Sequence, residues 1–528
     1  MSSANDSNSV KKSEEKEEEH IATADVHNVT TYTGELLRNR STFHVVFMAF
    51  VLASIPYGLA TTLYYPLVNG GPAAIVWGFF ATSIIIICVA VSLAEITSVY
   101  PTAGGVYHQT YMLLPASSRK AGSWVCGAAY VAGNVLITLA VNFGSTDFIV
   151  GCINVFESEP GVGIFQPEKY QHFLIFVAIT LLCNATSALG NRWLPLLDTF
   201  AIFWTFSGLI ALVVCLFALA RNGRNSGEYI FGHFEPLSGW PDGWAFCVGL
   251  LQAAYATSST GMVVSMCEEV KSPRTQVPKA IVGTVILNTL AGLLFLLTII
   301  TVMPASLTEI LNTSSGQPLP TIVKSATAHS GGAFALLIPL IILALLCGIA
   351  CTTAASRCLW AFARDGAIPA ARIWKRVDPF LSVPLNAMML SMAVQIALGF
   401  IYFGSTTAFN AFSSAGVIFL TVSYATPVAV SVFVGRRRQV SRGSFNLGVL
   451  GAVCNCVALA WSALAVPLFC MPSTLPATAT TVNYSCVVFV GFIAAASIWY
   501  WIWGHKRFTG PKVELVEGLG DGAVYESG

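Results

Sequence analysis

The fold of this chain is decided by residues 244–281, which read WAFCVGLLQAAYATSSTGMVVSMCEEVKSPRTQVPKAI. The first part is apolar and long enough to span a bilayer, but small and hydroxylic residues interrupt it halfway. Glu268, Glu269, Pro273 and Pro278 then close it. Backbone hydrogen bonds can be released at membrane depth only where protein or a water-filled cavity receives them, so a broken membrane helix usually borders a site. The stretch favours transport over other functions.

The composition places the rest of the chain in a membrane as well. Of its 528 residues, 55% are hydrophobic and only 10% are charged, and the mean hydropathy is +0.70. Ordinary soluble domains carry about 25% charged residues. We therefore predict an all-α polytopic membrane protein embedded in the lipid bilayer. About twelve apolar runs reach the length needed to span it: 43–67, 73–98, 123–150, 171–189, 194–220, 243–267, 279–303, 333–360, 382–403, 408–434, 447–470 and 481–503.

The Lys and Arg residues support this count, because short cytoplasmic loops are enriched in basic residues. We place the N-terminal tail, the loops after even-numbered spans and the C-terminal tail inside. Of the 27 basic residues, only four then lie outside: Lys169, Arg221, Arg224 and Lys324. Both termini are predicted to be cytoplasmic. Residues 1–42 form a disordered tail, 43–503 the transmembrane domain and 504–528 a C-terminal tail.

Span 1 carries a second interruption, at Ser54-Ile55-Pro56-Tyr57-Gly58. Proline removes a backbone donor and glycine lowers helix propensity, so we expect a kink or a short unwound segment. A proline kink without ligand contact is the alternative. Interrupted helices five spans apart are typical of inverted repeats that meet at a midplane site. We predict repeat one over 43–220, repeat two over 243–434 and two extra spans over 447–503.

The two interruptions supply the candidate substrate site. Exposed amides at the start of each second half-helix favour a carboxylate, and freed carbonyls favour a cation, so a zwitterion or a small organic cation fits. The rings of Tyr57 and Tyr255 can hold an ammonium by cation–π attraction worth about 0.5 to 2 kcal/mol. Packing is the competing interpretation of both rings and of the nearby hydroxyls. The candidates are Ser54, Ile55, Pro56, Tyr57, Gly58, Tyr255, Ala256, Thr257 and Ser258.

Catalytic and ATP-driven machinery is not found in the sequence. It contains no GxxxxGK[ST], HExxH or GxSxG motif, and its fourteen cysteines lack metal-ligand spacing. No basic stripe with interleaved aromatic residues suggests nucleic-acid binding. We expect a protein that is not an enzyme and that needs no cofactor, metal or nucleic acid. What fits is a carrier driven by an ion gradient or by the gradient of its own solute.

Ionisable groups inside spans are unfavourable by at least about 2.5 kcal/mol at the bilayer centre, so each requires a partner or a role. Glu95 is expected to join an inner gate with Arg357 or Lys279, with proton coupling as the alternative. Asp198 has the same two interpretations. Asp147, toward the outer end of span 3, is expected to attract cations at the vestibule.

Two further groups of polar residues lie near the inner side. Glu268 and Glu269 are expected to hold the inner gate through basic residues rather than to bind solute. Thr352, Thr353 and Ser356 in span 8 occupy the region where sodium could bind beside span 1, although helix packing explains these small residues better.

Two chemical modifications are possible at the outer side. Asn312 begins an Asn-Thr-Ser glycosylation sequon in an outer loop. Cys470 and Cys486 lie near the outer ends of adjacent spans, where a disulfide is one option, although nothing in the sequence sets the required geometry.

Three ordered motifs resemble the signature of the amino acid/polyamine/organocation transporter superfamily. Residues 94–107 resemble its AE[IL]xSxxPTAGGxY element, 268–281 its EExxxPxxxxPxAI element, and 355–369 its ASR…RDGxxP element. With Gly-Gly-Pro at 70–72, the sequence is similar to the fungal amino acid/choline branch, which includes GABA and choline permeases. The resemblance covers residues 33–510.

The resemblance implies a LeuT-like core of two inverted five-helix repeats, with discontinuous spans 1 and 6 and two extra spans. It also implies uptake of amino acids, GABA, choline or polyamines by alternating access, commonly with protons, at the plasma membrane. Many members carry Asn-Ser-Trp-x-Gly in span 1, where this chain has Ser54 to Gly58. No single member's substrate can therefore be transferred. A carrier or exporter of a specialised metabolite or its amino-acid precursor, and a non-transporting nutrient receptor, stay open.

Overall fold

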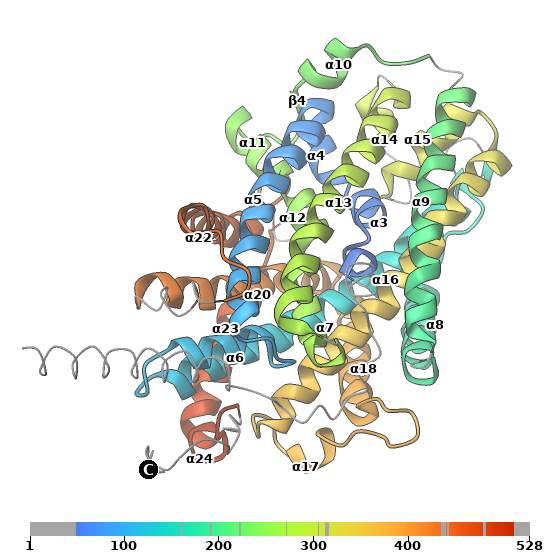
Figure 1. The fold of residues 1–528 in the computed structure, drawn as a ribbon. Helices are drawn as coiled ribbons and strands as arrows, with labels where there is room; N and C mark the ends of the chain where they lie inside the picture. Colours follow the sequence, from blue (N-terminus) through green and yellow to red (C-terminus); the bar gives the residue numbers. More distant parts are fainter. Residues whose placement is uncertain are drawn as a thin grey trace, which may run out of the picture.

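The computed structural model describes residues 49–511. The exceptions are 160–161, 191–192, 221–222, 271, 305, 312–315, 435–439, 441–442 and 479–481. The predicted N-terminal tail and residues 512–528 of the predicted C-terminal tail lie outside this part. The described part is a bundle of long helices with a few two- or three-residue strands (Figure 1).

The elements follow one another along the chain in this order. They are α3 (Ile55–Thr61), α4 (Tyr64–Val68), β1 (Asn69–Gly70), α5 (Gly71–Val99), α6 (Gly105–Leu113), α7 (Arg119–Ile153), β2 (Glu157–Glu159), β3 (Val162–Gly163), α8 (Lys169–Leu189), α9 (Leu194–Leu219), α10 (Gly227–Gly232), β4 (Glu235–Pro236), α11 (Asp242–Gly249), α12 (Leu251–Thr257), the 3₁₀ helix η1 (Ser258–Glu269), α13 (Pro273–Val302), α14 (Leu307–Leu311), α15 (Pro318–Thr327), α16 (Ser330–Arg364), α17 (Ala371–Trp374), α18 (Leu385–Gly399), α19 (Ile401–Gly404), α20 (Thr406–Phe433), α22 (Val449–Cys470), α23 (Ser485–Trp499), the π-helical turn η2 (Tyr500–Gly504) and α24 (His505–Arg507).

Eleven of the twelve predicted membrane spans are confirmed in place. In the described part of the chain, 11 helices are long and apolar enough to cross a membrane, and each coincides with one predicted span. The predicted span 243–267 is absent from this set because it is divided among α11, α12 and η1, each of which is shorter than a span. Residues 242–269 thus form three short helical segments instead of one continuous membrane helix.

Helices that lie five spans apart pack against each other. In Figure 1, α5 runs beside α13, and these two helices share an extensive contact. Likewise α7 packs against α16, and α3 packs against α12. Two inverted repeats of five spans are expected to place equivalent helices together in this way. The two broken spans therefore meet in the middle of the bundle.

The polar segment of α7 does not interrupt the helix, because polar side chains in it form hydrogen bonds with neighbouring helices. This helix is continuous over 35 residues, although the sequence is polar between Asn142 and Asp147. The Asn142 side chain donates to the Gln395 side chain of α18 at 3.3 Å and to Thr180 of α8 at 3.4 Å. Hydrogen bonds to neighbouring helices make a polar residue tolerable at membrane depth.

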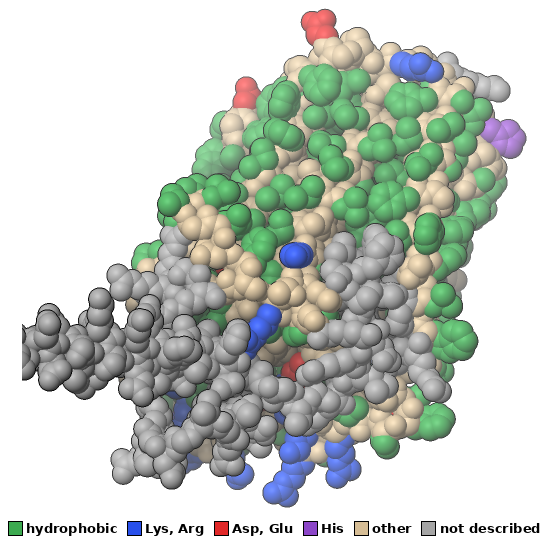
Figure 2. All heavy atoms as spheres, in the orientation of Figure 1, with side chains coloured by type: hydrophobic (Ala, Val, Ile, Leu, Met, Phe, Trp, Pro, Cys, Tyr) green, Lys and Arg blue, Asp and Glu red, His purple; other side chains and the backbone are tan. Residues whose placement is uncertain are grey.

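The two ends of the bundle differ in their elements and in charge. The short helices α10, α11 and α14 and strand β4 lie at one end, and α17 and α24 lie at the other (Figure 1). Figure 2 shows a broad area of hydrophobic side chains between these ends, with most of the visible Lys and Arg side chains at the α17–α24 end. This distribution matches the predicted alternation of the loops across a membrane.

Candidate functional site

Span 1 is broken at Ser54. Residues 49–53 are helical, and α3 begins again at Ile55. Ser54 between them has φ 37° and ψ 50°, the left-handed conformation that residues other than glycine seldom adopt. Because Pro56 lies in the first turn of α3, its missing N–H removes no bond that the helix requires. The break predicted from Ser54 to Gly58 is thus confined to one residue.

Span 6 is interrupted without becoming an open loop. The α-helix ends at Thr257, and the chain continues as a 3₁₀ helix of 12 residues, η1. Stretches of 3₁₀ helix longer than about four residues are uncommon, and a long one within a span often marks a hinge. The change occurs at Ser258, the last of the predicted half-site residues.

The carbonyl oxygen freed by the span 1 break is satisfied by other helices. The Leu52 carbonyl accepts hydrogen bonds from Ser259 Oγ at 3.1 Å and from Cys347 Sγ at 3.5 Å. Cys351 Sγ lies 4.0 Å from the same oxygen. These cysteines therefore serve as weak donors at the break. Among the described residues, no group of three or more His, Cys, Asp or Glu side chains could hold a metal ion.

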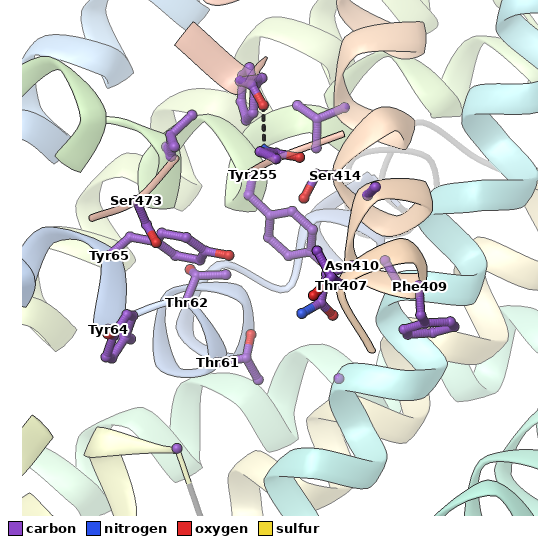
Figure 3. A pocket seen from close by; sticks show the side chains of 18 of the residues that line it. Thr61, Thr62, Tyr64, Tyr65, Tyr255, Thr407, Phe409, Asn410, Ser414 and Ser473 are labelled. Carbon is purple, nitrogen blue, oxygen red and sulfur yellow. Dashed lines mark hydrogen bonds between the residues drawn. The ribbon is translucent and has the colours of Figure 1, made fainter. Parts of the chain in front are cut away.

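A cavity of about 540 Å³ opens beside the two breaks. Its walls come from the ends of α3 and α4, from α7 and α12, from the start of α20 and from the loop after α22. Figure 3 shows the Tyr255 ring amid the labelled lining side chains. The hydrogen-bonding side chains of the lining include Thr61, Thr62, Tyr65, Asp147, Tyr255, Asn410, Ser414 and Asn483.

The two candidate tyrosines have different positions. Tyr255 lines the cavity. Tyr57 is only 3% exposed, and its hydroxyl lies 3.0 Å from the Val141 carbonyl, to which it donates, and 3.0 Å from Ser145 Oγ on α7. The Tyr57 ring also packs edge-on against Phe148. Tyr57 thus fastens α3 to α7, as the packing interpretation expects.

The other candidates line no part of this cavity. Ser54 Oγ donates to the Val51 carbonyl, and Ile55, Pro56 and Gly58 are buried. A Cβ at Gly58 would lie 3.2 Å from the Cβ of Ala256, so spans 1 and 6 approach each other closely at these residues.

Thr257 and Ser258 face a smaller cavity on another side of span 6. This cavity has a volume of about 30 Å³, and Tyr424 and Trp461 also line it. The hydroxyls of both residues already donate within the helix: Thr257 to the Ala253 carbonyl at 2.8 Å and Ser258 to the Tyr255 carbonyl at 2.7 Å.

The gate residues predicted at the inner side converge in one cluster, which we call the inner cluster. The Glu268 carboxylate accepts from Nη1 and Nη2 of Arg364 at 3.2 and 3.1 Å. It also accepts from the Ala103 amide at 3.2 Å. Arg357 Nε donates to Glu269 at 2.9 Å, and the Arg357 side chain is fully buried. Buried charges of this kind are tolerated only when they are paired and hydrogen-bonded.

The inner cluster unites the three sequence motifs. The segment 101–107 contributes the Ala103 amide and Tyr107, whose hydroxyl donates to Asp365 at 2.7 Å. The segment 268–281 contributes the two glutamates, and 355–369 contributes the arginines and Asp365. Arg364 also lies 4.6 Å from the centre of the Trp360 ring. Motifs separated by more than 250 positions thus form one connection between α6, η1 and α16.

Glu95 lies elsewhere than the sequence led us to expect. Its carboxylate accepts from the Leu447 amide at 2.9 Å and abuts Gly451 of α22. Within the described part of the chain, this side chain contacts neither Arg357 nor Lys279, because it projects from the side of α5 that faces α22. The side chain of Asp198 lies outside the described residues.

Of the two predicted modification sites, only the cysteine pair can be placed. Asn312 lies outside the described residues. Cys470 and Cys486 are both free thiols, and they are close enough to interact with each other.

The cavity contains residues that sequence reasoning missed. Thr61 and Thr62 lie one turn beyond the predicted break, and their position in the same helix was the available signal. Asn410 and Ser414 come from α20, and nothing in their local sequence marks them. Asp147 was identified as an acidic vestibule residue, but its partner His172, at 2.8 Å, was not.

Comparison with known proteins identifies clear relatives. The family model described as "Amino acid permease" matches residues 41–492. The chain is 30% identical to a choline transporter of Saccharomyces cerevisiae, over 90% of this chain and 83% of that protein. It is 28% identical to a GABA-specific permease of the same yeast, over 92% and 85% of the two chains. It is also 29% identical to an amino-acid permease of Arabidopsis thaliana, over 91% and 94%.

Proposed function

Because the chain belongs to the amino acid permease family, we propose that it is a secondary active transporter of a small amine-bearing solute. The solute class comprises amino acids and related amines such as GABA, choline and polyamines, and transport occurs by alternating access. One observation carries the proposal: a cavity of about 540 Å³ opens beside two broken helices, while buried ion pairs close the opposite side of the same helices. A site reached from one side and sealed from the other is what alternating access requires.

In this proposal the positions of the Lys and Arg side chains indicate which end of the molecule faces the cytoplasm. Most Lys and Arg side chains visible in Figure 2 lie at the end with α17 and α24, which we assign to the cytoplasm together with both termini. The inner cluster then closes the cytoplasmic side, and the cavity faces outward. In this proposal the molecule is an outward-open carrier that loads solute from outside, which suits uptake at the plasma membrane.

A proton is the proposed coupling ion. The alternative sodium site would use Thr352, Thr353 and Ser356, and Thr352 Oγ1 is buried without a hydrogen-bond partner among the described residues. However, Thr353 Oγ1 lies 2.8 Å from the Ile349 carbonyl and 2.8 Å from Ser187 Oγ. Ser356 Oγ donates to the Thr353 carbonyl and accepts from Arg357 Nη1 at 3.0 Å. A cation placed there would meet a guanidinium group, and this repulsion favours a proton as the coupling ion.

Uptake into proteoliposomes tests the proposal. Purified protein should accumulate one of the labelled amines above equilibrium when an inward proton gradient is imposed, and collapse of the gradient should abolish accumulation. Binding without accumulation under any gradient would instead indicate a receptor. Accumulation only with the gradient reversed would indicate an exporter.

A further inference from the structure

The electrostatic character of the cavity is set by one residue. Among the described lining residues, Asp147 is the only acidic residue, and no Lys, Arg or His lines the cavity. The stretches 312–315 and 479–481, which adjoin lining residues in the sequence, contain no ionisable side chain. The chamber is therefore anionic, and no cationic side chain of its described lining can pair with a solute carboxylate.

The backbone amides at the two breaks, which were expected to bind a carboxylate, do not compensate for the missing cationic side chain. Residues 54–58 lie outside the cavity lining, which begins in span 1 at Thr61. Residues 256–258 are absent from it as well, and two of them face the smaller cavity. The helix-start amides of both breaks are thus not presented to a solute in this chamber.

Asp147 is held so that one of its oxygens can act on a solute. Its Oδ1 accepts from His172 Nε2 at 2.8 Å. The other oxygen has no partner among the described residues, and the side chain is 40% exposed. By contrast, His172 is buried between Phe143, at 4.8 Å between ring centres, and Tyr402, at 5.4 Å. The ring cannot rotate without disturbing both contacts, so the orientation of the carboxylate is set in advance.

Aromatic rings complete a surface suited to an ammonium group. Tyr255 and Tyr65 line the cavity with Asp147, and the Tyr255 hydroxyl is close enough to Asp147 for an electrostatic interaction. Ring faces attract cations, and a carboxylate adds a full opposite charge. The combination attracts an organic cation and repels the carboxylate of an amino acid.

We propose that Asp147, positioned by His172, makes this carrier select cationic amines over zwitterions that bear a carboxylate. The inference rests on the proposed transport function and narrows its substrate class. Asp147 contacts the solute in this scheme, whereas His172 acts through Asp147 as a positioning residue.

Choline and glycine betaine provide a matched pair of probes. Both carry a trimethylammonium group, but betaine has a carboxylate where choline has a hydroxymethyl group. We expect the unaltered protein in proteoliposomes to take up labelled choline with a KM at least about tenfold lower than that of betaine, a ratio equivalent to about 1.4 kcal/mol. Asp147→Asn should raise the choline KM by about tenfold and leave the betaine KM unchanged or lower. Asp147→Glu should retain the preference.

The control variant is Glu159→Gln, which removes one negative charge from an exposed residue that does not line the cavity. It should change neither KM. Equal KM values for the two probes in the unaltered protein, or an equal change for both in Asp147→Asn, would overturn the selectivity inference while leaving transport intact. Failure to bind or transport either probe, or GABA or putrescine, would overturn the proposed function and this inference together.

The role of His172 is tested by its effect on choline alone. His172→Gln retains an N–H donor for Asp147, whereas His172→Phe retains the ring packing without that donor. We expect His172→Phe to raise the choline KM several-fold at unchanged kcat, and His172→Gln to restore most of the affinity. A fall in kcat for both probes alike would assign His172 to the structure of the bundle and remove it from selection.

Discussion

Tyr57 lies three residues after the span 1 break at Ser54, and Tyr255 lies three residues before the span 6 break at Ser258, yet their rings have different surroundings. Tyr255 faces the cavity, where an ammonium could approach its ring. Tyr57 is buried against α7, with its hydroxyl 3.0 Å from both the Val141 carbonyl and Ser145 Oγ. The two tyrosines differ in the direction of their side chains: Tyr255 lines the cavity, whereas Tyr57 packs between helices.

Tyr255→Ala should therefore weaken solute binding, whereas Tyr57→Phe should weaken the fold. Removing a cation–π partner worth about 0.5 to 2 kcal/mol should raise the KM for choline roughly two- to thirtyfold. Tyr57→Phe loses one hydroxyl interaction, worth about 0.5 to 1.5 kcal/mol, and should lower the melting temperature without changing KM. Uptake kinetics normalised to surface expression, with thermal unfolding of the purified proteins, distinguish the two effects. Equal loss of uptake and of expression in Tyr255→Ala would show that this residue is also packing.

Glu95 is a buried carboxylate whose contact is structural. It accepts from the Leu447 amide and thereby fastens the segment before α22 to the end of α5. Because an amide oxygen can accept the same bond, we expect Glu95→Gln to keep both solute exchange and gradient-driven accumulation. Exchange and accumulation assays on the same proteoliposomes measure this. If exchange persisted while accumulation disappeared, Glu95 would belong to the proton-coupling path.

At the scale of elements, the crossing of spans 1 and 6 depends on small residues. A Cβ on Gly58 would lie 3.2 Å from the Cβ and 3.3 Å from the Cα of Ala256. Such distances are too short for unstrained packing, so α3 and α12 would be pushed apart. Gly58 is thus required by the close approach of two helices, although a contact with solute was the reason for selecting it in the sequence.

Gly58→Ala should lower the stability of the protein by about 1 to 3 kcal/mol and reduce uptake in proportion to the misplacement of α12. Adding Ala256→Gly should recover much of both losses, because it removes the methyl group that the new Cβ meets. Thermal unfolding and uptake of the single and double variants provide the comparison. No recovery in the double variant would exclude this contact as the cause.

In the transport cycle that we propose, the inner cluster holds the whole molecule in its outward-open form. Glu268 pairs with Arg364 through two hydrogen bonds, and Glu269 pairs with the fully buried Arg357. Removing one partner of a buried ion pair is unfavourable by about 3 to 5 kcal/mol, because the remaining charge loses its compensation. Alternating access requires this cluster to open and close, so its strength sets the population of outward-open molecules.

Glu268→Gln should therefore shift the population toward inward-open molecules. A cysteine introduced at Thr62 in the cavity wall reports this, since a membrane-impermeant thiol reagent added outside reaches it only in the outward-open form. We expect Glu268→Gln to slow labelling of Thr62→Cys several-fold relative to the intact cluster. Glu235→Gln, which removes an exposed charge at the opposite end, is the control and should leave the rate unchanged. Faster or unaltered labelling in Glu268→Gln would contradict a locking role.

The membrane class and the family follow from the sequence, as do the approximate places of eleven of the twelve predicted spans. These features depend on apolar length, on charge alternation and on local motifs, and each of them is a property of neighbouring residues. The sequence also places the interruption of span 1 close to its observed position, at Ser54, the first residue of the predicted segment.

The packing of the helices in three dimensions sets which of the candidate residues line the cavity. Tyr255 enters the cavity and Tyr57 does not, and Glu269 rather than Glu95 meets Arg357. The cavity wall is assembled from helices far apart in the chain. The rotation of each helix about its own axis, set by packing against its neighbours, determines which of its faces lines that wall. Local sequence can show that a helix breaks, but the residues that pack against the break depend on how all the helices of the bundle are arranged.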